Sequence, residues 1–141
     1  MPTTMQKLTP ALMVEAIEPC LPFWERIGFT NVAQVPHGDH LGFVILVKDA
    51  VELMYQSRAS VGDDLPSLAR SPMGGTFLFL EVEDLDVVIA ELGDAPVVQP
   101  RRTTFYGMDE VAVREPGGNV VIFAQKTETA EQGESTEKTG A

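Results

Sequence analysis

The segment VELMYQ, residues 51–56, places one carboxylate, that of Glu52, in an apolar run with the alternation of a β-strand. Glu52 could face solvent, could pair with a protein cation such as Arg101 or Arg102, or could bind a cationic group of a ligand, because a buried charge needs a partner. Partial burial would also raise its pKa toward a range useful for general-base work, but no other feature of the sequence supports that role. We favour a paired pocket carboxylate that is not a metal ligand.

Two other groups of residues could do chemistry. His37 and His40 flank a Gly-Asp pair, which is the composition of a metal clip or of a polar hairpin turn, and we favour the turn. Arg101 and Arg102 precede Tyr106, and this segment either gates a cleft or is only an exposed strand connection. The sequence has no Ser/His/Asp or Cys/His arrangement, no phosphate-binding loop and no basic aromatic stripe. Hydrolysis and nucleic-acid binding are therefore not supported.

Composition limits the class of protein. The chain has 141 residues and a formal net charge of -11, which disfavours binding to phosphate backbones and anionic membranes. Cys20 is the single cysteine, which fits a reducing compartment. No signal peptide and no apolar run of about 20 residues is present, so no membrane partner is expected. We predict a cytoplasmic location.

The elements that would position these residues occur twice in the same order. A strand at residues 8–14, a short helix ending near Ile27 and three further strands up to residue 56 form a first βαβββ module, residues 8–56. A linker follows, residues 57–75, with a helical turn near residues 64–70. The second module, residues 76–126, has strands at 76–83, 96–99, 109–115 and 119–125, and a helix capped by Asp84 and ended by Gly93. Residues 1–7 are expected to be flexible. Residues 127–141 form an acidic tail without branched aliphatic or aromatic side chains, which predicts disorder.

Four segments of the duplicated pattern resemble a known family. These are LTPALMV, PFWERIGF, FLEVEDLD and the closing hairpin YGMDEVAVREPGGNVVIFAQ, in which Glu115 stands where relatives typically have Asp. The chain resembles the vicinal oxygen chelate superfamily, which includes glyoxalase I, bleomycin-resistance proteins and extradiol dioxygenases. The resemblance implies an α+β fold in which two βαβββ repeats form a cupped mixed sheet with the helices outside.

The resemblance also locates four positions at which metal-using relatives place His, Gln or Glu. Here they are held by Thr9, Glu52, Phe77 and Ile122. A catalytic metal generally needs about three protein ligands and one open position, and only one strong ligand remains. The chain is therefore closest to bleomycin-resistance-like members that lack the metal ligands, and we predict neither a catalytic residue nor a cofactor.

Strand alternation assigns the lining of the remaining pocket. With the resemblance, it gives these ligand-binding residues: Thr9, Met13, Glu52, Met54, Phe77, Phe79, Arg102, Tyr106 and Ile122. Alternatively, Phe77 and Ile122 belong to an ordinary core. The predicted surface suits an aromatic or cationic small molecule.

The resemblance implies a cytoplasmic homodimer that sequesters such a ligand, for example a cationic antibiotic, as in antibiotic resistance. One alternative is a metal-dependent glyoxalase- or dioxygenase-like lyase or isomerase with an atypical ligand set, in which case a divalent metal would be the cofactor. A second alternative is a module whose role is only dimerisation or regulation.

Overall fold

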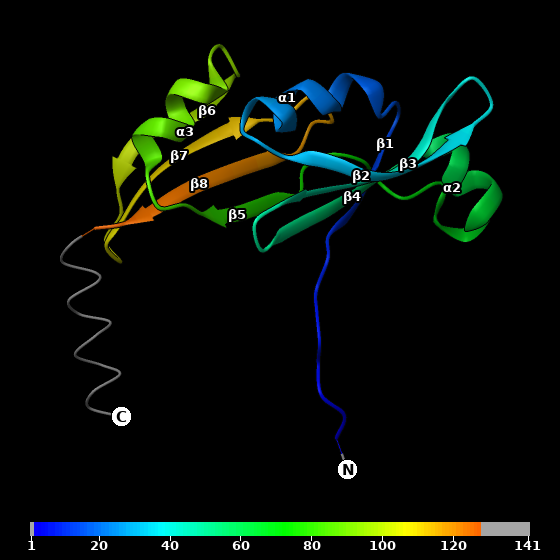
Figure 1. Cartoon of the computed structure of the whole chain (residues 1–141), viewed down its shortest axis with the longest axis horizontal. Helices are drawn as coiled ribbons and strands as arrows, with labels where there is room; N and C mark the ends of the chain where they lie inside the picture. Colours follow the sequence, from blue (N-terminus) through cyan, green and yellow to red (C-terminus); the bar gives the residue numbers. More distant parts are fainter. Residues whose placement is uncertain (1, 128–141) are drawn as a thin grey trace. The chain divides into compact units, whose positions relative to one another are not determined.

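The computed structural model describes residues 2–127, and the chain divides into two compact units, Met1–Met73 and Gly74–Ala141 (Figure 1). The predicted acidic tail lies outside the described residues, except for Thr127. Among residues 2–127, no helix has the length and the apolar character needed to cross a bilayer.

The first unit contains a four-stranded mixed sheet with the order β1-β4-β3-β2. Strand β1 pairs in parallel with β4, and the other two pairs are antiparallel. The elements in chain order are β1 (Ala11–Val14), η1 (Glu18–Cys20), α1 (Leu21–Arg26), β2 (Thr30–His37), β3 (His40–Lys48), β4 (Val51–Ser57), α2 (Arg58–Asp64) and η2 (Pro66–Leu68).

Aromatic side chains dominate the core beneath α1. Phe23 and Trp24 are buried, and the Trp24 ring makes edge contacts with Phe23 and Phe29 at centroid distances of 5.1 and 4.9 Å. The Trp24 indole Nε1–H donates a hydrogen bond of 2.8 Å to the buried hydroxyl of Tyr55 on β4. This contact satisfies a polar group that would otherwise be buried without a partner. Trp24 therefore fixes α1 on one face of the sheet.

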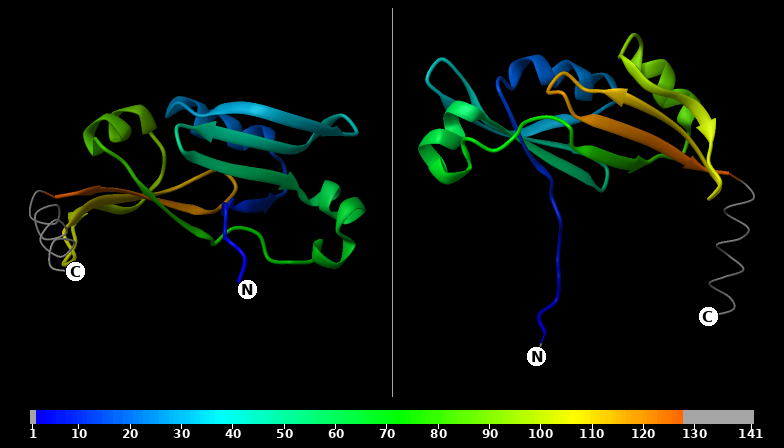
Figure 2. Two further views of the ribbon diagram at one scale, coloured as in Figure 1. Left: turned by 60° about the horizontal axis from the view of Figure 1, so that its bottom comes forward. Right: turned by 180° about the vertical axis from the view of Figure 1, so that it is seen from behind.

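The second unit repeats the arrangement with the sheet order β5-β8-β7-β6, in which β5 and β8 are parallel (Figures 1 and 2). Its elements are β5 (Phe77–Glu81), α3 (Leu85–Leu92), β6 (Val97–Thr103), β7 (Met108–Arg114) and β8 (Val120–Lys126). As predicted, the Asp84 side chain caps α3 by accepting from the Val87 N–H, and Gly93 ends it with a φ of 61°. The α+β class and the two βαβββ repeats are confirmed.

Some local predictions differ from the structure. The first predicted helix divides into η1 and α1, because Pro22 has no N–H to donate to the carbonyl four residues earlier. Strand β1 is shorter than the predicted strand, so Thr9 lies just before it. The predicted linker contains α2, whose start is capped by the Ser57 hydroxyl. Strand β6 extends to Thr103 and therefore includes both arginines.

Candidate functional site

The predicted site residues of the first unit share the sheet face opposite α1. On β4, Leu53 and Tyr55 are buried beneath the helix side, whereas Glu52 and Met54 alternate with them on the other face and are half-buried. Met13 of β1 is half-buried and pairs in register with Gln56 of β4, which places it on the same face. We call this surface the helix-free face of the first sheet.

Glu52 is already bound by two groups of its own unit. The Thr9 hydroxyl donates a hydrogen bond of 3.0 Å to Glu52 Oε2, and the Lys7 ammonium forms an ion pair with the same oxygen. The Glu52 side chain is 20% exposed. These contacts, that of Lys7 foremost and then that of Thr9, hold the pKa of Glu52 below its ordinary value. The site therefore stabilises an ionised carboxylate, the opposite of the raised pKa expected for a general base.

The sequence suggested Arg101 or Arg102 as the cation that pairs with Glu52, but the structure shows Lys7 in this role. Both arginines bind acidic residues of the second unit instead. Lys7 was overlooked because it lies in the N-terminal stretch predicted to be flexible. Nothing in its local sequence signals a contact with a residue 45 positions later. The prediction that Glu52 is paired is confirmed, with a different cation.

In the second unit, the predicted aromatic residues lie on the face opposite α3. Phe77 and Phe79 are 72% and 53% exposed, and they belong to β5, an edge strand of the sheet. Phe79 pairs in register with Ile122 of β8, and Ile122 pairs with Ala112 of β7. These residues form an apolar row across three strands, which we call the helix-free face of the second sheet. The interpretation of Phe77 as an ordinary core residue is wrong.

Charged residues form the next row of this helix-free face. Arg102 of β6 pairs in register with Glu110 of β7, which stands two residues from Ala112 on the same face. The Arg102 Nη2 donates a hydrogen bond of 3.0 Å to Glu110 Oε1, and the Tyr106 hydroxyl donates one of 3.1 Å to Glu110 Oε2. The Glu110 side chain is only 6% exposed, whereas that of Arg102 is 53% exposed. A buried carboxylate therefore holds both predicted residues, Arg102 and Tyr106.

Glu110 was not predicted as a site residue. Its position in a strand of alternating polarity, two residues before Ala112, places it on the pocket side, and that signal could have found it. What the pattern does not give is the pairing with β6, because β6 has two register irregularities, between Val97 and Gln99 and between Gln99 and Arg102.

Arg101 lies on the opposite face of the same strand. Its guanidinium binds Asp109 of β7, with an Nη2–Oδ2 distance of 2.8 Å, and also pairs with Asp86 of α3. These carboxylates raise the pKa of Arg101, so the side chain stays charged. Arg101 connects the sheet with its helix, whereas Arg102 belongs to the helix-free face.

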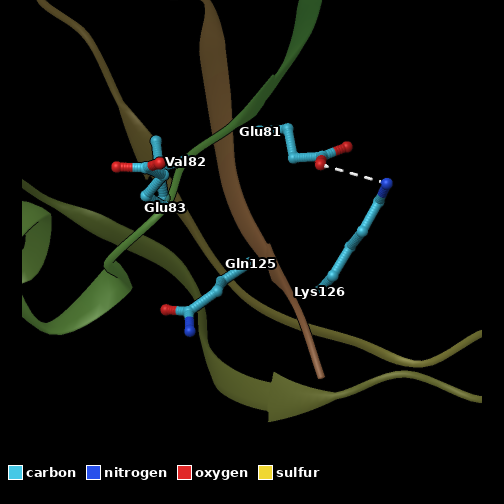
Figure 3. Close-up of a pocket in the computed structure, with 5 residues that line it drawn as sticks. All are labelled: Glu81, Val82, Glu83, Gln125 and Lys126. Atoms are coloured by element: carbon cyan, nitrogen blue, oxygen red, sulfur yellow. Dashed lines mark ion pairs between the residues drawn. The ribbon is translucent and has the colours of Figure 1, made fainter. Parts of the chain in front are cut away.

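A cavity of about 440 Å³ lies at the ends of β5 and β8 (Figure 3). It is lined by Glu81, Val82, Glu83, Gln125 and Lys126. The ammonium of Lys126 points toward Glu81 at 3.6 Å, and the Gln125 amide oxygen accepts from the first N–H of α3, that of Leu85. In this cavity, Glu81 and Lys126 therefore form an ion pair, and Gln125 stabilises the start of α3.

The donor set does not fit a divalent metal ion. The resemblance assigned four positions to metal ligands. Two of them, Phe77 and Ile122, have hydrocarbon side chains. At the other two, the Thr9 hydroxyl donates a hydrogen bond to the Glu52 carboxylate. Elsewhere in residues 2–127, no three His, Cys, Asp or Glu side chains are grouped as metal ligands would be.

The two histidines take separate partners at the hairpin between β2 and β3. His37 Nε2 lies 2.6 Å from Asp63 Oδ2, and His40 Nδ1 lies 3.6 Å from Glu18 Oε2. Gly38, with a φ of 62°, forms the turn between them. The turn interpretation is therefore correct, and each histidine links the hairpin to a different carboxylate.

Solved structures share this architecture. A glyoxalase/bleomycin resistance protein/dioxygenase from Nocardioides is 18% identical and has a TM-score of 0.70, with 90% of this chain and 87% of that chain covered. TioX from Micromonospora sp. ML1 is 16% identical with a TM-score of 0.72, covering 86% and 99%. A bleomycin-binding protein complexed with bleomycin is 19% identical with a TM-score of 0.59, also covering 86% and 99%. No protein-family model and no curated protein matches the sequence. The chain has the glyoxalase/bleomycin-resistance/dioxygenase fold, which is the fold of the vicinal oxygen chelate superfamily.

Proposed function

We propose that this protein binds a small aromatic molecule without a metal ion and without transforming it. The ligand lies on the helix-free face of the second sheet, over Phe77, Phe79 and Ile122. The bleomycin-binding protein with the same fold supports small-molecule binding as the activity. The proposal extends the predicted sequestering function, in which the bound compound is kept away from its target.

One observation carries this proposal: two phenylalanine rings are exposed side by side on one strand face. Phe77 and Phe79 are two residues apart on β5, so they project from the same face. Exposed apolar groups of this size on a soluble domain mark a binding surface more often than chance. Rings bind other rings in stacked or edge-to-face arrangements, which suits a flat aromatic ligand.

Glu52 does not supply the cation-binding group that the sequence suggested for this ligand. Lys7 and Thr9 both bind Glu52 Oε2, so the negative charge of Glu52 is already compensated by an ammonium group of the protein, which weakens its attraction for a cationic ligand. The aromatic part of the predicted ligand is therefore the part that the proposal retains.

The test is a calorimetric titration of the full chain with 2-naphthalenemethanol, an uncharged aromatic probe, and with bleomycin. We expect saturable binding of the naphthalene probe. Phe79→Ser should weaken its binding by about tenfold or more, since a buried aromatic contact contributes roughly 1.5–3 kcal/mol. Heat denaturation gives a second readout, because a ligand at 100 times its Kd stabilises the folded state by about 2.7 kcal/mol.

Val97→Ser is the matched control. Val97 is an exposed apolar residue of the same unit, and it pairs in register with Val113 of the helix side, so it lies on the other face. Its substitution should leave the affinity for the probe unchanged. Absence of any saturable binding by the wild-type protein would refute the proposed function.

Assembly as a homodimer stays a prediction of the resemblance. Sedimentation equilibrium of the full chain with and without bound probe measures it directly. A dimer whose subunits separate in the Phe77→Ser variant would instead assign this ring to subunit contact.

A further inference from the structure

The charge preference of the ligand can be read from the groups that flank the aromatic surface. Glu110 is buried and accepts one hydrogen bond on each carboxylate oxygen, from Arg102 and from Tyr106. Since both oxygens are engaged, Glu110 orients its neighbours and is not available to a ligand. Arg102 is in the reverse situation, because half of its side chain is exposed and only one of its nitrogens is bonded within residues 2–127.

We propose that Arg102 binds a carboxylate carried by the aromatic ligand. A guanidinium has five N–H donors in a planar fork, which matches a planar carboxylate with two parallel hydrogen bonds. Nη2 has two N–H groups and only one of them is directed at Glu110, so its second N–H and the adjacent N–H of Nε or Nη1 form a parallel pair of donors for the ligand. The proposal rests on the proposed function and adds the chemical class: an aromatic monocarboxylate.

The surroundings of Arg102 suit a ring attached to such a carboxylate. Phe105 and Tyr106 form an edge-to-face pair with ring centroids 5.0 Å apart, and both are exposed. Ala112 lies two residues from Glu110 on the same face of β7, about 7 Å along the strand. A ring over Ala112 and Ile122 therefore places a substituent within reach of Arg102.

The other charged residues on this face of the second sheet favour the same sign of ligand charge. Glu81 is paired with Lys126, so a cationic ligand would have to compete with this lysine for the carboxylate. The net charge of -11 opposes the approach of an anion from a distance, but this repulsion is screened beyond about 8 Å at physiological ionic strength. Contacts at Arg102 act at hydrogen-bond distance and therefore decide the preference.

Three probes with one ring isolate the effect of charge: 2-naphthoate, 2-naphthalenemethanol and 2-naphthylmethylammonium. Each is titrated calorimetrically into the full-length protein at the same ionic strength. We expect 2-naphthoate to bind about 10- to 100-fold more tightly than the alcohol, the factor that a charge-assisted hydrogen bond contributes. The ammonium probe should bind no more tightly than the alcohol.

Arg102→Gln should remove the preference for 2-naphthoate and leave the affinity for the alcohol within about threefold. Arg102→Lys keeps the ion pair with Glu110 but not the planar fork, so it should retain only part of the preference for 2-naphthoate. Because this variant keeps the charge, it also tests the proposal if Arg102→Gln fails to fold. Arg101→Gln is the matched control, because Arg101 is the adjacent arginine and lies on the helix side. The 2-naphthoate preference of this control should equal that of the wild type.

The outcomes separate the two proposals. If none of the three probes binds, the proposed function fails, and this inference fails with it. If the alcohol binds but 2-naphthoate does not bind more tightly, or if Arg102→Gln retains the preference, the carboxylate site is wrong while the aromatic site stands. Tighter binding of the ammonium probe would likewise overturn the inference and favour a cationic ligand.

Discussion

The two units share the order of their strands and their main helix but differ in where most of their aromatic residues lie, although Phe123 is buried in the second unit too. In the first unit, Phe23 and Trp24 are buried beneath α1. In the second, the helix α3 buries aliphatic residues, Leu85 and Leu92, while Phe77 and Phe79 are exposed on the other face. A repeated topology thus specifies where side chains project, and the residue types decide which face becomes a core and which becomes a binding surface.

Both units have an ion pair in which the cation is the more exposed member. Lys7 is 62% and Glu52 20% exposed in the first unit, and Arg102 is 53% and Glu110 6% exposed in the second. The pairs differ in the type of cation, because a guanidinium, unlike an ammonium, can donate two parallel hydrogen bonds to a carboxylate. This difference is the reason for assigning ligand recognition to the second unit.

The largest expected effect is a difference in the free energy of unfolding between two variants that each lose an aromatic ring. Trp24→Ala should lower the free energy of unfolding by about 3–5 kcal/mol, as large-to-small substitutions of buried aromatic residues do. Phe77→Ala should change it by no more than about 0.5 kcal/mol, since the ring is largely exposed. Urea denaturation of both variants measures the two values. Equal losses would show that Phe77 belongs to a core and would end the contrast between the units.

Two tyrosine hydroxyls give the next contrast. Tyr55→Phe leaves the buried Trp24 N–H without this acceptor and should cost about 1–3 kcal/mol. Tyr106→Phe removes a hydrogen bond from a half-exposed side chain, so we expect a loss of about 0.5–1.5 kcal/mol. The same denaturation experiment compares them. A larger loss for Tyr106→Phe would mean that the Glu110 cluster is chiefly structural.

A smaller effect concerns the ion pairs of Arg101. Arg101→Gln removes the connection of β6 with Asp86 of α3, and we expect a smaller loss of stability than for Tyr55→Phe, because exposed ion pairs contribute little. Hydrogen exchange of the α3 amides should accelerate while that of α1 is unchanged. Unchanged exchange in α3 would show that Arg101 does not stabilise this helix against the sheet.

The smallest effect is the pH dependence of the Lys7–Glu52 pair. Because the folded-state pKa of Glu52 is lowered, the pair stabilises the protein above the unfolded pKa of about 4.3 and loses this effect as the pH falls through the folded pKa. Lys7→Ala should raise the Glu52 pKa toward its ordinary value, as measured by carbon-detected NMR titration. The stability difference between the variant and the wild type should vanish at low pH. An unshifted pKa in the variant would exclude Lys7 as its main cause.

Most of the fold could be predicted from the sequence because its signals are local. Helix α3 shows this, with apolar residues at helical spacing between the cap Asp84 and the terminal Gly93. Helix α2 could not be found in this way, since it buries only Val61 and contains Gly62. Its one sequence signal is Ser57, whose hydroxyl accepts from the Ser60 N–H.

Less of the candidate site could be predicted, because its contacts join distant positions. Strand alternation correctly placed Phe77, Phe79 and Met54 opposite the helices. The pairing of Lys7 with Glu52 and the register between Arg102 and Glu110 depend on tertiary structure and on the irregular pairing of β6. Periodicity within a single strand contains no information about either contact.

Calorimetric titration of the EDTA-dialysed full chain with 2-naphthoate tests the central claim most directly. The account predicts saturable binding to the metal-depleted wild type that is strongly weakened in the Phe77→Ser/Phe79→Ser double variant. Binding that appears only after Zn²⁺, Ni²⁺, Mn²⁺ or Fe²⁺ is restored, or binding that the double variant retains in full, would contradict it.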